Sequence, residues 1–176
     1  MPPLTGIFII AELAGPAAER IRTIHERYDP KLAAMSGPHL TIVGSSGAGP
    51  IAARTSAASL RAAIEPIAAE TAPIELHFLP PMRFMQSEIV VLPLDPHGPL
   101  RVLHERLKTS GLQYARPRFA FTPHVTLSFY PTLTPTRVRQ LLSIRVDEPA
   151  VIDALIVSET RDPLPPRKLF EAKLGG

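Results

Sequence analysis

The sequence predicts one α+β domain in which a single order of strands and helices occurs twice. Three observations support this fold class. The chain has 176 residues, of which 45% are hydrophobic, enough for one sizeable core. Short runs rich in β-branched residues alternate with segments that have helical spacing. A Pro-His-apolar-Thr tetrapeptide occurs once in each half, at 38–41 and 123–126. We therefore expect a single domain over 1–176.

The first half begins with a β-rich apolar run and continues through helices that start or stop at prolines. Pro16 is acceptable in the first turn of a helix, Pro66 is expected to kink or end one, and Pro73 closes the Ala-rich segment. The Gly-rich loop after the second strand has the composition of a connection. The expected elements are a strand at 6–13, a helix at 16–28, a strand at 39–43, a helix at 51–71 and a strand at 74–79.

The second half has the same order of elements. Pro99 and Pro135 each suit the first position of a helix, and Thr134 suits the N-cap of the latter. We expect a strand at 87–94, a helix at 99–111, a strand at 121–130, a helix at 134–143 and strands at 154–159 and 167–174. The repetition predicts an internal pseudo-repeat of approximately 6–80 and 87–174, which places the two tetrapeptides at equivalent positions.

Composition excludes several classes of protein. The absence of cysteine excludes disulfides, thiolate zinc sites, iron–sulfur clusters and a cysteine nucleophile. The N-terminal segment lacks a cationic region and is interrupted by Glu12, so we expect a strand rather than a signal peptide and a cytoplasmic protein. No apolar run approaches the ~20 residues of a membrane span, so no membrane partner is expected. The 21 prolines lie mostly at element boundaries and do not indicate disorder.

The tetrapeptides place their polar side chains on one face of a strand. In a strand, residues i and i+2 point to the same side. His39 and Thr41 should therefore share a face with each other, as should His124 and Thr126, while Leu40 and Val125 point to the core. An imidazole moves protons near neutral pH and a hydroxyl can donate to a phosphate oxygen. The alternative is that both histidines are half-buried strand residues bonded to the backbone.

At these residues the sequence resembles the 2H phosphoesterase superfamily, which contains the bacterial 2′-5′ RNA ligase-like proteins and the RNA 2′,3′-cyclic phosphodiesterases. Its signature is two His-apolar-Thr/Ser motifs, and the stretch RPRFAFTPHVTLSF at 116–129 is similar to the context of the second one. The first motif departs from many relatives, which carry an aromatic residue where this chain has Gly37-Pro38. The resemblance covers nearly the whole chain. It implies a bilobal, pseudo-twofold LigT-like fold with two mainly antiparallel sheets around a central cleft and helices outside.

The resemblance also implies a function. His39 and His124 would be the catalytic pair and Thr41 and Thr126 the phosphate-binding residues. The implied activity is metal-independent hydrolysis of 2′,3′-cyclic phosphates of RNA ends or nucleotides, with reversible 2′-5′ RNA ligation as a further activity. No metal and no cofactor are expected, because Asp and Glu are absent beside both motifs. We expect a monomer whose partner is an RNA terminus or a cyclic nucleotide.

Two other functions stay open at this point. The same residues could hold an RNA end or a nucleotide without turnover, or the enzyme could act on a metabolite other than nucleic acid. Two intact histidines favour the enzyme, because binding alone does not need two proton-transfer groups.

The remaining polar and aromatic residues are weaker candidates. Arg116 and Arg118 are candidate ligands of a substrate phosphate or else solvated loop residues. Tyr130 lies six residues past His124, where it could stack on a base or form a rim or core aromatic. Phe119 and Phe121 are expected to pack. His25, His97 and His104 are expected at the surface or lining a helix. His77 is expected in a strand, either exposed or with its hydrogen bonds satisfied.

Overall fold

The computed structural model describes residues 5–84, 87–129, 133–162 and 164–176. Within those ranges every paired strand runs antiparallel to its neighbour, in one seven-stranded sheet of order β4-β5-β6-β2-β1-β8-β9 and one two-stranded sheet, β3-β7. The strands are β1 (Thr5–Glu12), β2 (His39–Val43), β3 (Ile74–Leu76), β4 (Met82–Arg83), β5 (Val90–Pro93), β6 (His124–Ser128), β7 (Ala150–Ile152), β8 (Ala154–Arg161) and β9 (Arg167–Lys173).

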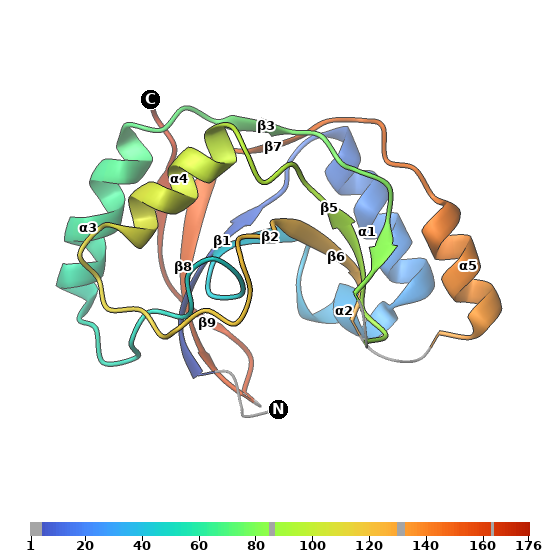
Figure 1. Cartoon of the computed structure of the whole chain (residues 1–176), viewed down its shortest axis with the longest axis horizontal. Coiled ribbons are helices and arrows are strands. Elements are labelled where there is room, and N and C mark those ends of the chain that lie inside the picture. The colour runs from blue at the N-terminus through green and yellow to red at the C-terminus, as the bar shows by residue number, and fades with distance from the viewer. Residues whose placement is uncertain (1–4, 85–86, 130–132, 163) are drawn as a thin grey trace.

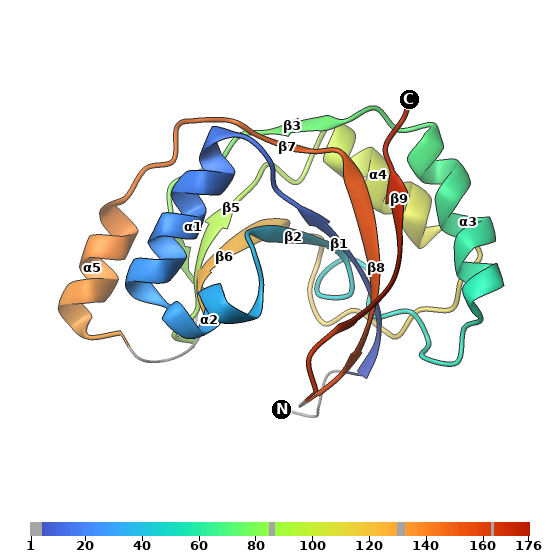
Figure 2. The same ribbon diagram turned by 180° about the vertical axis from the view of Figure 1, so that it is seen from behind.

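The helices lie at the two ends of the molecule. They are α1 (Pro16–Tyr28), α2 (Pro30–Met35), α3 (Ala57–Ala69), α4 (Pro99–Lys108) and α5 (Pro135–Ser143). Figures 1 and 2 show α3 and α4 at one end, α1, α2 and α5 at the other, and the β3-β7 ribbon running between the ends. The antiparallel sheets with helices outside confirm the expected α+β class. The two sheets are unequal, because β2 pairs with β6 and joins the strands of both ends into one sheet.

Several elements differ from those expected from the sequence. The helix expected at 51–71 begins only at Ala57, because the Ser56 side chain caps it by accepting from the Ser59 N–H at 3.1 Å. Three short elements, α2, β4 and β7, were not expected. The side chain of Asp29 accepts from Leu32 N at 3.0 Å and so caps α2, with Pro30 at its first position.

Glycine followed by proline starts the two helices that follow β1 and β5. Gly15 and Gly98 have φ of +92° and +71°, a region that favours glycine, and Pro16 and Pro99 open α1 and α4. β2 and β6 are neighbours at the centre of the sheet. β1 lies beside β2 on one side of this pair, and β5 lies beside β6 on the other side. The internal pseudo-repeat of approximately 6–80 and 87–174 stays a prediction, with which this arrangement is consistent.

The core lies between the central strands and the helices, and the helices cross over between the halves. α1, which follows β1, packs against β6, and α4, which follows β5, packs against β2. Leu40 of β2 and Val125 of β6 are fully buried, as are Leu103 and Leu107 of α4. Each motif strand is therefore supported by the helix that belongs, in sequence, to the other half.

Candidate active site

The two motif strands are neighbours at the centre of the sheet. Leu40 of β2 lies opposite Val125 of β6 in an antiparallel pair. Continuing that register by one residue in each direction places His39 beside Thr126 and Thr41 beside His124. All four of these side chains are half-buried, whereas Leu40 and Val125 are fully buried on the opposite face. The expected alternation is therefore present, and two imidazoles and two hydroxyls meet on one face.

Proline limits the pairing of these two strands. Pro38 and Pro123 immediately precede the histidines and have no N–H to donate to a neighbouring strand. Their carbonyl groups are used on the other side, accepting from Leu13 N and Leu94 N at 3.0 Å each. Leu40 and Val125 are consequently the one residue pair that joins β2 to β6 within the described residues. The sheet therefore has its fewest strand-to-strand pairs beside the two histidines.

Each motif histidine is held through Nδ1. His39 Nδ1 lies 2.9 Å from the carbonyl oxygen of Gly37, and His124 Nδ1 lies 2.8 Å from that of Thr122. A carbonyl oxygen only accepts, so Nδ1 carries the hydrogen in both rings. Nε2 of each neutral ring is then an unprotonated base, and the same atom of a charged ring is an acid. The two histidines are equivalent in this respect.

The surroundings of the two rings differ. The ring of Phe84 meets the His124 ring edge to face, with the centroids 4.8 Å apart. Burial lowers the pKa of His124; the bond to the Thr122 carbonyl opposes this effect and the charge of His39 adds to it. The neutral form of His124 is therefore favoured at neutral pH, which is the form that accepts a proton.

Two further histidines are buried beneath the central strands, contrary to the expected surface or helix-lining position. His25 of α1 is 2% exposed and its Nε2 lies 2.8 Å from the Thr126 carbonyl oxygen. His104 of α4 is fully buried and its Nδ1 lies 2.8 Å from the Ile42 carbonyl oxygen. Burial lowers the pKa of both. The register that pairs Leu40 with Val125 puts Ile42 opposite Pro123, which has no N–H to donate. His104 therefore supplies the donor that the Ile42 carbonyl would otherwise lack.

A sequence signal for these two histidines exists in the helical period. Within α4, His104 follows Leu100 by four residues and Leu103 by one, on the buried side of the helix. In α1, His25 likewise follows the buried Ile21 by four residues.

The positions of His97 and His77 agree with those expected from the sequence. His97 is exposed in its turn, and His77 is exposed with Nε2 2.8 Å from a carboxylate oxygen of Glu75.

The other candidate residues are distributed unevenly. Arg118 lines a pocket of about 430 Å³ beside α4, whereas Arg116 is exposed and does not line it. Phe121 is buried and stacks on the His104 ring, as expected, but Phe119 is 68% exposed, so the expectation that it packs is wrong. The reason is that Phe119 belongs to an irregular segment whose side chains face solvent. Tyr130 lies outside the residues that the structure describes.

The described residues form neither a metal-binding cluster nor a membrane-spanning helix. Across residues 5–84, 87–129, 133–162 and 164–176, no group of three or more His, Cys, Asp or Glu side chains could hold a metal ion. None of the helices in these ranges has the length and apolarity needed to cross a bilayer.

Comparison with known proteins places this geometry in a family. Residues 12–161, which include all four motif side chains, match the family model of the 2′-5′ RNA ligase superfamily. A Geobacillus kaustophilus (strain HTA426) protein named as a phosphoesterase is 36% identical over 103 residues. That match covers 58% of this chain and 56% of the relative, so it spans little more than half of the relative's length.

Solved structures share the fold at low sequence identity. The Thermus thermophilus protein TT0787 has a TM-score of 0.64 at 18% identity, over 97% of this chain and 98% of that one. Escherichia coli LigT in complex with NADP⁺ has a TM-score of 0.61 at 18% identity, over 98% of both chains. The family match over most of the sequence and the shared fold over almost all of it agree. The chain belongs to the 2′-5′ RNA ligase superfamily.

Proposed function

We propose that the chain is a phosphoesterase, and specifically a metal-independent phosphodiesterase that hydrolyses 2′,3′-cyclic phosphates of RNA ends or nucleotides. The observation that carries the proposal is the pair of half-buried histidines on adjacent strands, each fixed through Nδ1 and each flanked by a threonine hydroxyl. The relative named as a phosphoesterase and the crystal structures of E. coli LigT complexed with 3′-AMP and with ATP support a nucleotide-like phosphate ester as substrate.

In the proposed reaction, Nε2 of one histidine removes a proton from water as the water oxygen bonds to phosphorus. The bond from phosphorus to one ribose oxygen breaks, and the other histidine donates its Nε2 proton to that oxygen. We give the role of base to His124, whose neutral form is favoured by burial, and the role of acid to His39. Hydroxyl groups of Thr41 and Thr126 donate to the phosphate oxygens that gain charge. Ligation would use the 5′-hydroxyl of a second RNA end in place of water: its oxygen bonds to phosphorus, the bond from phosphorus to the 3′-oxygen breaks, and the two ends are joined by a 2′-5′ linkage.

The test compares the wild type with His39→Ala and His124→Ala on three substrates. These are a 2′,3′-cyclic mononucleotide, an RNA oligomer with a cyclic phosphate end and a 2′-5′-linked dimer. Each substitution should lower turnover by about 10²- to 10⁴-fold, the usual contribution of a positioned acid or base. The exposed His77 provides a matched control, and His77→Ala should keep wild-type turnover. Near-normal turnover in either motif variant, at intact folding, would refute the assignment.

Two further measurements separate the finer parts of the proposal. Turnover should persist in excess chelator, since both proton transfers are assigned to imidazoles; its loss, with recovery on adding a divalent cation, would contradict metal independence. The acid limb of the kcat/KM profile should lie below 6.5, the ordinary histidine value, because the pKa of His124 is lowered. Tight binding of an RNA end without turnover by the wild type would support a binding module instead.

A further inference from the structure

A charged pocket lies beside α4, outside the motif residues. Its volume is about 430 Å³. One wall is formed by Arg101, Glu105 and Lys108 of α4, and the other by Arg118, Phe119 and Phe121 of the segment that leads into β6. Neither the histidine pair nor the two threonines line it, so the reaction proposed above leaves this pocket unexplained.

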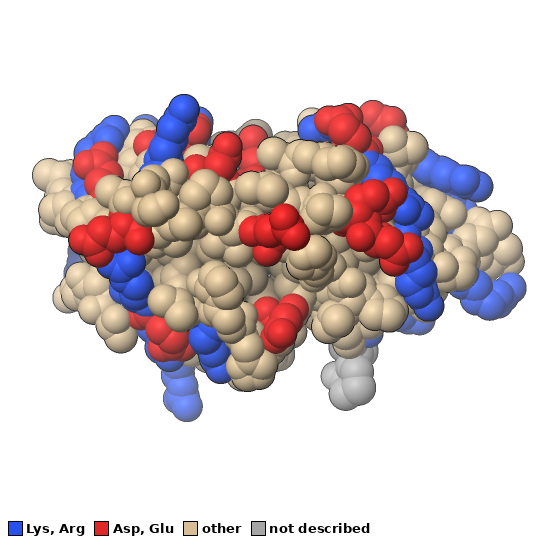
Figure 3. Space-filling view, turned by 90° about the horizontal axis from the view of Figure 1, so that it is seen from above, with Lys and Arg blue, Asp and Glu red and all other residues tan. Residues whose placement is uncertain are grey.

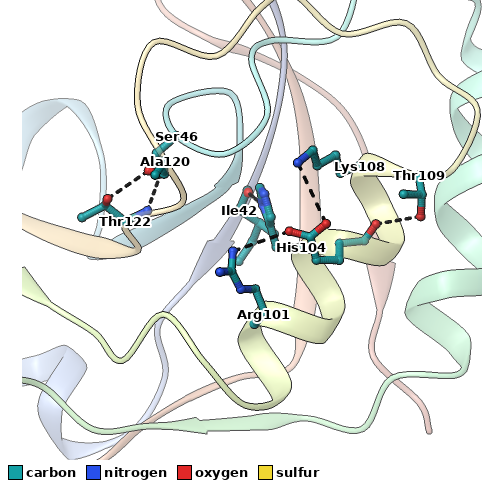
Figure 4. A network of polar contacts seen from close by, with 9 residues as sticks. Ile42, Ser46, Arg101, His104, Lys108, Thr109, Ala120 and Thr122 are labelled. Atoms are coloured by element: carbon teal, nitrogen blue, oxygen red, sulfur yellow. Dashed lines mark hydrogen bonds and ion pairs between the residues drawn. The ribbon is translucent and has the colours of Figure 1, made fainter.

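The charges around the pocket are unbalanced. Arg101 Nη1 lies 3.5 Å and Lys108 Nζ 4.0 Å from oxygens of the same carboxylate, that of Glu105, and the dashed lines from both cations converge on it in Figure 4. Both separations exceed the roughly 2.7–2.9 Å of a close charge-assisted hydrogen bond, and the Arg101 and Lys108 side chains are 41% and 45% exposed. Arg118 also lines the pocket, and the two cations of α4 share the single carboxylate of Glu105. Such a site favours an anion.

The face of the molecule seen from above has a different distribution of charge. Figure 3 shows acidic and basic side chains interspersed across that face, which is the side of the β3-β7 ribbon in Figure 1. Neighbouring charges of opposite sign largely cancel at distances beyond the Debye length of about 10 Å. The α4 pocket, by contrast, has the two cations of α4 against one carboxylate.

Aromatic rings complete the pocket in two different ways. Phe121 is buried and stacks on His104, with the ring centroids 3.9 Å apart and the planes at 16°, so it forms a fixed floor. Phe119 is 68% exposed beside the cations. An exposed phenyl ring next to positive groups suits stacking of a nucleobase while the cations contact the phosphates.

The pocket is fixed relative to the candidate active site. The loop after β2 is tied to the segment before β6, because Gly47 N donates to the Phe119 carbonyl at 2.9 Å and Thr122 N donates to Ser46 Oγ at 3.0 Å. Figure 4 shows Ser46 next to Ala120 and Thr122 on this loop contact. His124 follows Phe121 by three positions in the chain, which limits the distance between their Cα atoms to about 11 Å. That is the rise of about three stacked nucleotides at about 3.4 Å each.

We propose that this α4 pocket binds the phosphodiester chain of single-stranded RNA, holding nucleotides that lie 5′ of the end placed between His39 and His124. Arg101 and Lys108 contact backbone phosphates and Phe119 stacks on a base. The inference rests on the proposed function, and it makes an RNA chain, rather than a free mononucleotide, the preferred substrate class of that site.

The test measures equilibrium binding of a fluorescently labelled single-stranded RNA decamer with a 3′-phosphate, by anisotropy at several salt concentrations. The variant is Arg101→Gln/Lys108→Gln. The matched control is Arg106→Gln/Arg139→Gln. It also removes two positive charges, but both lie outside the pocket, since Arg106 pairs with Glu70 and Arg139 belongs to α5. Loss of two phosphate contacts should reduce the slope of log K against log salt by about 1.4, and the control should keep the wild-type slope.

A second variant tests the aromatic contact. Phe119→Ala should weaken binding by about 5- to 150-fold, the usual range for loss of one base stack, without changing the salt slope. The inference would be overturned if the salt slope of the pocket variant were unchanged or if the control lost as much slope as the pocket variant. It would also be overturned if polyglutamate of equal charge displaced the RNA or if the wild type bound no RNA. Hydrolysis of a cyclic phosphate is assayed separately. RNA binding without hydrolysis contradicts the proposed function, whereas hydrolysis with an unchanged slope contradicts only the α4 pocket.

Discussion

Replacing His104 by leucine should destabilise the protein from its centre. The His104 ring is fully buried, its Nδ1 donates to the Ile42 carbonyl oxygen at 2.8 Å, and one face stacks on Phe121. Leucine has an apolar side chain of similar bulk but has no donor. The substitution therefore removes the hydrogen bond and the ring stack and leaves most of the space filled.

The expected loss follows from those two contacts. An unsatisfied buried carbonyl costs about 1–3 kcal/mol, and a lost stack of two rings costs about 0.5–1.5 kcal/mol. The sum of roughly 2–4 kcal/mol is a large part of the 5–15 kcal/mol that ordinarily stabilises a domain. At about 2–4 °C per kcal/mol for a chain of this size, Tm should fall by roughly 4–16 °C.

A matched variant isolates the hydrogen bond. The side-chain nitrogen of asparagine occupies nearly the place of Nδ1, so His104→Asn can keep the donor while it loses the stack. Urea unfolding of the wild type and the two variants at pH 7.5 should rank them wild type, His104→Asn, His104→Leu in falling free energy of unfolding. Equal stability of wild type and His104→Leu, or a less stable His104→Asn, would refute the role assigned to the bond with Ile42.

Acid should weaken the wild type through the same residue. Burial lowers the pKa of His104 in the folded state below 6.5, so the unfolded chain takes up the proton first. The stabilisation is complete above pH 6.5 and is lost as the pH falls from there through the folded-state pKa. The slope is at most about 1.4 kcal/mol per pH unit for each such histidine. Between pH 7.5 and 5.5, His104→Asn should therefore lose less stability than the wild type.

The remaining predictions concern neighbouring contacts. His25→Gln places a side-chain nitrogen near the position of Nε2 and should unfold at higher urea than His25→Leu; the reverse order would contradict the bond to Thr126. Gly47 and Gly98 share φ near +71°, but an added Cβ would lie 2.4 Å from the His104 ring at Gly47 and would meet nothing within 4 Å at Gly98. Gly47→Ala should thus lower Tm well beyond Gly98→Ala. Asp29→Ala should cost about 2–4 kcal/mol, because the buried carboxylate caps α2 and accepts from the backbone N–H that follows β6 at 2.8 Å, and thermal melting measures it.

The parts of the site that the sequence predicts are those governed by local geometry. The alternation of His39, Leu40 and Thr41 follows from the period of a strand, and the same rule applies around Val125, so burial could be assigned without the rest of the fold. The positions of most helix starts follow equally from proline and from capping side chains.

The parts that the sequence does not predict depend on distant partners. β7 is three residues long and exists through its pairing with β3, about 75 residues away. Burial of His25 and His104 depends on carbonyl groups 101 and 62 residues distant. The helix α2 differs, because its signals are local: Asp29 and Pro30 are a cap and a first-turn proline, and they also occur together in turns.

The crossing of α1 onto β6 and of α4 onto β2 has a consequence for how the protein is made. A nascent chain that ends near residue 80 has completed α1 but has no partner for His25, and Asp29 still lacks the backbone group of Phe129 that lies 100 residues further on. The buried face of α1 remains open until β6 has left the ribosome. Folding of the centre is consequently a late, long-range event, and a fragment cut between the halves would expose on each piece the surface that the other covers.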